Sequence, residues 1–375
     1  MKYFYLILIF VSFCFGGEFE EFKSSQSKQF ENFSGEFEKY QKVYASEFAS
    51  YSKSIAKNFG KAQLSSQHIW VGYDEKFLAK KSVDFKNAQL NFEVIAKDEK
   101  DAKEKISKLL DEISKETTKS AFEGNLLEKN VRQKLNIKSG EIDDKPLVFD
   151  AFTPKQIEAE KSKLKDASLQ KTSFNKNQIF KFNIKMPDDF TIKKAKIYAP
   201  SAQKFATQYS LPIELVLAII HTESSFNPMA KSPAPAYGLM QIVPRSAGSD
   251  VAKTLGHNQN VLTPEFLYDS DNNILYGTTY LNLLNTKYFA KISNPKSKLF
   301  CVISAYNTGA SNVARTFDKT TKMDEAAPKI DAISSDEVYQ KLIVSLPFIE
   351  TREYLFRVTE RLEIYKKLLE NGQIR

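Results

Sequence analysis

A glutamate stands directly behind an apolar run in the second half of the chain. The run extends over 215–220 (Leu-Val-Leu-Ala-Ile-Ile), and Glu223 follows three positions later. Burying an unpaired carboxylate is costly, so a carboxyl group in such surroundings keeps its proton near neutral pH. A carboxyl group that is protonated at pH 7 can serve as a general acid.

Three clusters of polar and aromatic residues follow this glutamate. They are the segments 237–241 (Tyr-Gly-Leu-Met-Gln), 304–309 (Ser-Ala-Tyr-Asn-Thr-Gly) and 350–354 (Glu-Thr-Arg-Glu-Tyr). Cleavage of a glycosidic bond needs a proton on the leaving oxygen and a group that stabilises the positively charged anomeric carbon. The combination of a protonated acid with such clusters indicates this chemistry.

The second stabilising group is usually another carboxylate, but the sequence offers none in an environment like that of Glu223. The candidates are Asp250, Glu265, Asp269 and Asp271, and all lie in polar stretches that predict solvated loops or helix caps. A lone acid favours a substrate-assisted reaction, in which the sugar's own acetamido oxygen stabilises the anomeric carbon. The same glutamate, once ionised, then takes a proton from the 6-hydroxyl group, and the product is a 1,6-anhydro sugar.

These motifs resemble a known family. Segments 223–228 (Glu-Ser-Ser-Phe-Asn-Pro), 238–241 (Gly-Leu-Met-Gln), 305–309 (Ala-Tyr-Asn-Thr-Gly) and 350–354 are similar, in order and spacing, to those of the goose-lysozyme-like lytic murein transglycosylases. The likeness is greatest to the membrane-bound lytic transglycosylase C group, and it extends from about residue 183 to 365. The resemblance implies a peptidoglycan lyase that cleaves the β-1,4 bond between N-acetylmuramic acid and N-acetylglucosamine, with no cofactor and no metal.

The resemblance also implies roles for individual residues. Glu223 would be the sole catalytic acid and base. The expected substrate-binding residues are Ser224, Ser232, Gly238, Met240, Gln241, Tyr306, Asn307, Glu350 and Tyr354. The chain departs from the family pattern at 233–235 (Pro-Ala-Pro), where a more polar loop is common, and at Tyr237, where an aliphatic residue is usual.

Other interpretations of these residues stay open at this point. Glu223 could be a helix-end carboxylate bonded by Ser224 or a neighbouring serine, Tyr306 and Tyr354 could be core tyrosines, and Met240 is as well suited to packing as to recognition. A hydrolytic goose-type muramidase and a non-catalytic wall-binding scaffold are the alternative functions. His221 and His257 receive no role, because neither is spaced to face the acid on a helix.

Positioning these motifs requires a helical domain. From residue 192 onward every segment predicts helix, with helices over about 272–288, 298–306, 334–346 and 351–369. Pro200 is expected to kink or restart the first helix, and Pro212 suits the first turn of the next. The glycines at 238, 277 and 309 predict close approaches or helix ends.

The first half predicts a mixed α/β domain. Alternating residues between 68 and 96 and over 180–185 predict antiparallel strands, and a helix capped by Asp98 is expected between them, with Ile106, Leu109, Leu110 and Ile113 on one side. The charged stretch 155–176 predicts a solvated helix. Before the strands, aromatic residues at three- and four-residue steps over 30–51 predict an amphipathic helix that packs on its own domain or lies on a membrane or wall.

The resulting fold class is α+β. Residues 1–17 are predicted to be a signal peptide, 18–188 an N-terminal α/β accessory domain with a small antiparallel sheet and a leading amphipathic helix, and 189–375 an all-α lysozyme-like catalytic domain. The leader has a positive start, a short apolar core and Gly16-Gly17 at its end. The alternative to its removal is a lipid anchor on Cys14, whereas Cys301 is expected to be a buried hydrophobe.

The charge balance is consistent with an exported wall enzyme. The formal net charge of +8 favours an anionic partner, but the lysines are scattered among acids rather than gathered into a stripe. We therefore expect peptidoglycan glycan strands and no nucleic acid as the partner, a periplasmic location with or without a lipid anchor, and no transmembrane span, since the leader is shorter than the roughly 20 residues that a spanning helix needs. The sequence predicts no specific protein partner.

Overall fold

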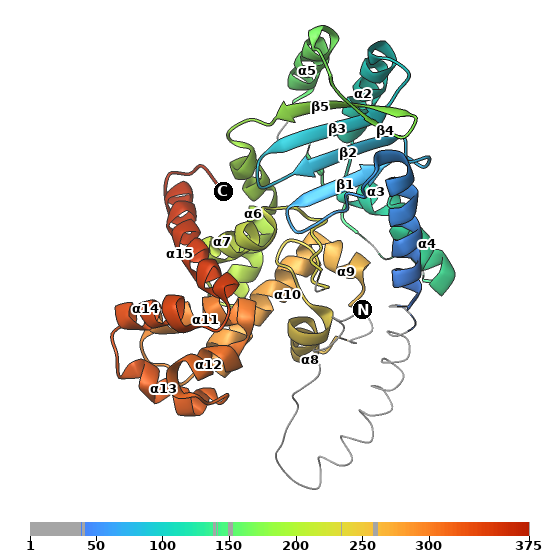
Figure 1. Ribbon diagram of the computed structural model, residues 1–375. Coiled ribbons are helices and arrows are strands. Elements are labelled where there is room, and N and C mark those ends of the chain that lie inside the picture. The colour runs from blue at the N-terminus through green and yellow to red at the C-terminus, as the bar shows by residue number, and fades with distance from the viewer. Residues whose placement is uncertain are drawn as a thin grey trace.

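The computed structural model describes residues 39, 42–137, 140, 142–148, 153–233, 235–257 and 262–374. A sheet with attached helices is built from residues 42–185 (the sheet unit), and an assembly of helices is built from residues 190–374 (the helical unit) (Figure 1). This arrangement confirms the predicted α+β class. The bounds of the domains themselves stay a prediction, and the predicted leader and Cys14 lie outside the described residues.

The sheet is five-stranded and antiparallel, in the order β1-β2-β3-β5-β4. Its strands are β1 (Ile69–Tyr73), β2 (Ala79–Asp84), β3 (Gln89–Ile95), β4 (Gln170–Phe174) and β5 (Asn177–Lys185). In the central pair Leu90 lies opposite Ile184 and Val94 opposite Phe180. These four side chains are buried, so the alternation read from the sequence corresponds to one face packed on a core.

The helices of this unit comprise one over 42–59, α2 (Glu99–Ile113), α3 (Thr118–Glu123), α4 (Leu126–Leu135) and α5 (Pro154–Asp166). The predicted helix α2 is confirmed, since the Asp98 side chain accepts a hydrogen bond from the amide of Asp101 and the predicted apolar side is buried. In helix 42–59, Tyr51 packs edge-on against Tyr73 and Phe77. This part of the predicted amphipathic helix therefore lies on its own unit, whereas residues 30–37 and Tyr40 lie outside the described residues.

The single solvated helix predicted over 155–176 is wrong in its second half. The helix α5 ends at Asp166, and β4 begins at Gln170. Asn175, in a left-handed conformation with φ 54°, makes the tight turn that pairs β4 with β5. The residues of β4 are nearly all exposed at the edge of the sheet, so the strand forms through backbone pairing and carries almost no apolar pattern.

The helical unit contains, among the described residues, the helices α6 (Phe190–Gln208), α7 (Ile213–Ser224), α8 (Ser249–Leu255), α9 (Pro264–Tyr268), α10 (Ser270–Leu283), α11 (Pro295–Thr308), α12 (Ala310–Asp318), α13 (Met323–Asp331), α14 (Ser335–Ser345) and α15 (Ile349–Glu370). Short π-helical segments occupy Pro244–Gly248 and Leu284–Tyr288. The latter ends the helix predicted over 272–288.

Proline positions differ slightly from the prediction. Pro200 lies inside the continuous helix α6, so it does not restart the helix. Pro212 is the N-cap of α7 rather than a residue of its first turn. A proline in a helix removes one backbone donor, and the packing of the α6 side chains around it, including the fully buried Tyr198, holds the remaining turns together.

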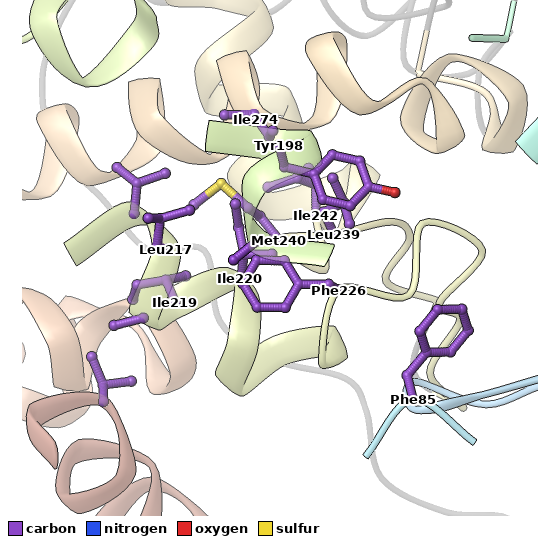
Figure 2. Close-up of a cluster of buried hydrophobic side chains, with 14 of the residues drawn as sticks. Phe85, Tyr198, Leu217, Ile219, Ile220, Phe226, Leu239, Met240, Ile242 and Ile274 are labelled. Atoms are coloured by element: carbon purple, nitrogen blue, oxygen red, sulfur yellow. The ribbon is translucent and has the colours of Figure 1, made fainter. Parts of the chain in front are cut away.

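The helix α7 is enclosed by the rest of the helical unit. Figure 2 shows Leu217, Ile219 and Ile220 of α7 within one cluster with Tyr198 and Met240. All of these side chains are fully buried. Neighbouring helices α6 and α15 both pack on α7, so the apolar run before Glu223 is the centre of a core rather than an exposed stripe.

The two units are joined by polar contacts as well as by the core. Lys194 of α6 is completely buried, and its ammonium donates to the backbone carbonyls of Pro146 and Leu147. Lys145 forms an ion pair with Asp271 at 2.9 Å. The segment 142–148 of the sheet unit is thereby attached to both α6 and α10.

Two further expectations concern apolar segments. Cys301 is a free, fully buried thiol, as predicted, and burial raises its pKa. Within the described part of the chain, we find no helix with the length and apolar content needed to cross a bilayer.

The glycine at 277 makes one close approach possible. A Cβ atom at Gly277 would collide with the side chain of Met240, including its sulfur. We expect Gly277→Ala to lower the free energy of unfolding by about 1–3 kcal/mol, because the packed core cannot shift freely. Chemical denaturation measures this change, and a cycle with Met240→Ala should show positive coupling. Strict additivity of the two substitutions would contradict the packing explanation.

Candidate active site

Glu223 occupies the last turn of α7 and is only 9% exposed. Burial, with a smaller contribution from the nearby carboxylate of Glu350, raises the pKa of its carboxyl group to about 8. The Tyr354 hydroxyl and the Arg357 guanidinium oppose the rise, without cancelling it. Glu223 is therefore protonated at neutral pH, as the apolar run before it predicts.

Two tyrosines border this carboxyl group. The Tyr306 hydroxyl donates to the backbone oxygen of Met240 at 2.9 Å, and the charge of Glu223 contributes to a raised Tyr306 pKa. The buried Tyr354 hydroxyl makes no hydrogen bond of standard geometry within the described residues, yet it is near enough to Glu223 to lower the pKa of that carboxyl group. We conclude that the Tyr354 hydroxyl faces Glu223.

The turn over 237–241 is held in place from both sides. The Ser224 hydroxyl, next to Glu223, donates to the backbone oxygen of Leu239 at 2.8 Å. The Asn273 side chain accepts from the amide of Met240 and donates to the carbonyls of Tyr237 and Leu267. Asn273 is fully buried, so these bonds fix the turn relative to α7 and α10.

Three of the expected substrate-binding residues are buried, and their contact with substrate stays a prediction. Ser224 and Met240 are completely buried, so the Ser224 hydroxyl bonds only backbone oxygens and the Met240 side chain packs in the core. The packing interpretation of Met240 is thus the better one. Gly238 is buried too, with φ 75°, and a Cβ atom there would collide with Asn273 and Leu267. These three residues build the turn, and their side chains do not face the solvent.

Gln241 and Ser232 differ in exposure, and Gln241 is buried. The Gln241 amide donates to the carbonyls of Ala230 and Gly238, whereas its Oε1 is buried without a hydrogen-bond partner among the described residues. Ser232 is partly exposed, and its hydroxyl accepts from the amide of Ala236. The bond between Ser232 and Ala236 therefore closes this loop, which contains two prolines.

The last two expected residues lie at the junction of α11 and α15. Asn307 is partly exposed, and its side-chain oxygen accepts from the buried Thr351 hydroxyl at 2.7 Å. Glu350 is exposed and lies in the first turn of α15. Tyr306, Glu350 and Tyr354 thus lie near Glu223. Asn307 lies beside them through its bond to Thr351.

The other carboxylates were expected in solvated loops or caps, and this is wrong for Glu265. Asp269 does cap α10, but the side chain of Glu265 is buried and its pKa is raised by burial. The reason is its contact with the sheet unit, where the Arg132 guanidinium lies 4.0 Å from it. Among the described carboxylates, Glu350 is the one whose charge acts on Glu223, and it is exposed.

The histidines have structural contacts. His221 bonds the Tyr365 hydroxyl at 3.0 Å, and His257 bonds the Tyr276 hydroxyl at 2.9 Å. Among the described residues, the hydrogen bonds of both rings are made with tyrosine hydroxyls. The third histidine, His68 of the sheet unit, bonds the Ser225 hydroxyl at 3.2 Å.

The turn that follows Glu223 depends on the sheet unit. Ser225 and Phe226 have φ angles of 53° and 65°, a left-handed conformation that costs energy for residues other than glycine. The Asn227 side chain donates to the carbonyls of Ser66 and Gln67 and accepts from the amide of Met229. The strained turn is therefore held by contacts across the two units.

Sequence reasoning missed the supporting residues. Asn273, His68 and Thr351 were not singled out, and Asn227 was noted only as part of a motif. Each makes at least one contact with a residue 33 or more positions away, as in the bond between Asn273 and Met240, and local pattern carries no signal for such contacts. Asn273 alone had a clue, because an amide on the buried side of an apolar helix needs partners.

The raised pKa of Glu223 makes stability depend on pH. The folded chain keeps this proton up to about pH 8, whereas an unfolded chain releases it near 4.5. The folded state binds more protons within this window, so its stability falls as pH rises, by at most about 1.4 kcal/mol per pH unit. We expect Glu223→Gln to be more stable than the wild type at pH 8 and equal to it below pH 4.5, measured by thermal unfolding. Parallel stability curves would contradict the burial of a protonated acid.

Loss of the contact across the units should weaken the fold. We expect Asn227→Ala to lower the free energy of unfolding by about 1–3 kcal/mol, because it leaves buried backbone groups without partners. Urea denaturation measures the effect, with the exposed Gln203→Ala as the control variant. Equal stability of the two variants would show that Asn227 does not hold the turn.

Part of the helical unit is similar to known proteins. Residues 200–327 match the family model of the Transglycosylase SLT domain. The membrane-bound lytic murein transglycosylase C of Pectobacterium atrosepticum is 39% identical over 199 residues, which are 53% of this chain and 55% of that protein. The protein of the same name from Klebsiella pneumoniae strain 342 is 39% identical over 189 residues, 50% of this chain and 52% of its own.

The chain spans about half the length of the curated relatives it matches. The 70 kDa soluble lytic transglycosylase from Escherichia coli matches with 16% identity and a TM-score of 0.35, over 72% of this chain and 44% of its own; a likeness this low carries no argument. The family-model match covers residues 200–327, and this range includes Glu223. Residues 200–327 of this chain thus match the transglycosylase SLT domain, and about half of the chain is similar to the membrane-bound lytic murein transglycosylases C.

Proposed function

We propose that this protein is a lytic transglycosylase that cleaves the β-1,4 bond between N-acetylmuramic acid and N-acetylglucosamine in peptidoglycan. The observation that carries the proposal is the buried Glu223 carboxyl group, with a pKa raised to about 8, beside two tyrosines. The SLT family match and the names of the relatives support the same substrate class. The helical unit is the catalytic domain, lysozyme-like in fold, over 189–375.

The proposed reaction uses one acid twice. Glu223 donates its proton to the glycosidic oxygen, and the bond between that oxygen and the anomeric carbon breaks while the sugar's acetamido oxygen stabilises the carbon. The ionised Glu223 then takes the proton of the 6-hydroxyl group, whose oxygen forms the new bond to the anomeric carbon. The proton returns to Glu223, no water is consumed, and a 1,6-anhydro end results.

Neighbouring groups suit the binding of a sugar. The buried Oε1 of Gln241, which has no partner among the described residues, can accept a hydrogen bond from an acetamido N–H group. Burying this oxygen without a partner is costly, so a ligand donor there is favourable. Asn307 and Glu350 offer polar groups at the exposed side, and a pocket of about 390 Å³, bordered by Tyr280 and Thr308, adjoins Tyr306.

Tyr354 and Ser232 act on either side of the reacting bond in this proposal. Tyr354 faces Glu223 and can donate a hydrogen bond to the carboxylate after proton transfer, which makes the ionised form less costly. Ser232 orients the substrate from the loop beside Gln241.

The remaining assignments concern the rest of the chain. We infer that residues 1–17 direct export, with a lipid anchor on Cys14 as the alternative to their removal, and that 18–188 form an accessory domain. The relatives' name describes them as membrane-bound, and it supports a location in the cell envelope. A hydrolytic muramidase and a non-catalytic wall-binding scaffold are the alternatives that the experiments below separate.

Removal of the acid should abolish activity. We expect Glu223→Gln to reduce the rate of clearing of a peptidoglycan suspension by at least about 10²-fold, because general acid catalysis contributes 10²–10⁴-fold. Glu265→Gln, another buried glutamate with a raised pKa, is the matched control and should retain activity. Equal clearing by wild type and Glu223→Gln would leave only the scaffold interpretation.

The products distinguish the two enzymatic mechanisms. Mass spectrometry of digested peptidoglycan should show 1,6-anhydro-muramic ends, which are lighter by one water than reducing ends. Activity should also fall as pH rises through about 8, since Glu223 then loses the proton it donates. Reducing muramic ends would establish a muramidase instead.

A further inference from the structure

His68 brings an imidazole of the sheet unit to the turn that follows Glu223. It immediately precedes β1, and its Nδ1 lies 3.2 Å from the Ser225 hydroxyl. The backbone of Ser224 also hydrogen-bonds the ring. One side chain of the sheet unit therefore contacts both of the residues that follow the acid, and no step of the proposed reaction uses it.

The backbone that carries this side chain is fixed in the sheet unit. The His68 carbonyl accepts a hydrogen bond from the amide of Phe85 at 2.9 Å, and the Phe85 side chain is buried in the core. The carbonyl of the next residue, Ile69, accepts from the amide of Ser66 at 2.8 Å. A displacement of the imidazole would therefore disturb the edge of the sheet.

The turn that His68 contacts needs outside support. Ser225 is the C-cap of α7, and both Ser225 and Phe226 have left-handed backbone conformations. Such conformations are disfavoured in residues other than glycine and persist only where surrounding contacts impose them. The Phe226 ring is held in the core cluster (Figure 2), where it stacks on Tyr198. Ser225 has only its hydroxyl, which bonds His68.

A change in this turn would reach the acid directly. The amide of Ser225 donates to the carbonyl of His221 at 3.1 Å and so closes the last turn of α7, which contains Glu223. Helix ends open locally at a lower free-energy cost than the core of a protein. Opening would let water reach the carboxyl group and would remove the burial on which its retained proton depends.

The ring is suited to a fixed role rather than to a titrating one. Burial lowers the pKa of His68, and the cations Lys86 and Arg361 act in the same direction. The backbone of Ser224 and the carboxylate of Asp84 oppose this effect without cancelling it. The imidazole is therefore neutral at pH 7 and above. A neutral imidazole has one donor and one acceptor, so it can bond a hydroxyl and a backbone carbonyl together.

We propose that His68 is a positioning residue for the reaction of Glu223. Its imidazole holds the left-handed turn at Ser224 and Ser225, and it thereby keeps the acid in the dry surroundings from which the proton is donated. This rests on the proposed function for the identity of the reaction. The sheet unit thus acts on catalysis through the end of α7.

Direct titration of the acid in the full-length protein tests the proposal. NMR of protein with isotope-labelled glutamate carboxyl carbons follows each side chain, and the Glu223 signal is the one that Glu223→Gln removes. In the wild type its titration midpoint should lie at about pH 8. His68→Ala should lower this midpoint by roughly one pH unit, because partial hydration cancels part of the effect of burial.

Three further variants isolate the bond. His68→Asn places a side-chain oxygen close to the position of Nδ1, where it can accept from the Ser225 hydroxyl, and should return the midpoint toward that of the wild type. Ser225→Ala removes the same bond from the other side and should lower the midpoint with the sheet unit unaltered. His257→Ala is the matched control, because this histidine bonds the Tyr276 hydroxyl instead, and it should leave the midpoint unchanged.

Activity provides the second measurement. His68→Ala should reduce the rate of peptidoglycan clearing at saturating substrate roughly 10-fold with little change in the half-saturation concentration, since misplacing a catalytic group slows the chemical step. Midpoints equal to that of the wild type in both His68→Ala and Ser225→Ala would overturn the proposal, even if His68→Ala unfolds more easily. If the midpoints shift as expected but the wild type leaves peptidoglycan intact, the proposed function fails while the hold of His68 on the acid is upheld.

Discussion

The burial of one carboxyl group is the constraint on which the candidate site depends. Glu223 ends a helix whose apolar residues are enclosed on all sides, and the resulting loss of hydration keeps its proton in place. Ionising a carboxyl group in such surroundings is costly. The surrounding structure therefore has to be rigid enough to prevent water from reaching it. The fully buried polar residues around it, Ser224 and Asn273, serve that purpose by bonding backbone groups.

The site therefore has two kinds of residue with different duties. Ser224, Gly238, Met240 and Gly277 shape the turn beside the acid, and their side chains are inside the protein. Tyr306 and Tyr354 lie close enough to the acid for its charge to raise their pKa. A motif in the sequence contains both kinds without distinguishing them. Maintaining the turn geometry and binding a ligand are separate requirements, and adjacent residues meet them.

The sheet unit takes part in this arrangement through the turn after Glu223. Two successive residues there have left-handed conformations, and strain of this kind persists only where surrounding contacts impose it. Asn227 and Ser225 receive those contacts from Ser66, Gln67 and His68. Ser66 also lines a cavity between the sheet unit and the loop 229–233 of the helical unit.

The sequence by itself determined the local features: the antiparallel strands, the capped helix α2, the helical second half and the burial of Glu223. Each of these follows from side-chain periodicity or from an unbroken apolar run, which neighbouring residues define. Tertiary structure decided the rest. The burial of Glu265 requires Arg132, the edge strand β4 exists only by pairing with β5, and Met240 packs inward because Gly277 leaves room for it. These outcomes depend on partners distant in sequence or on backbone pairing, and such contacts leave no periodic signal in a single chain.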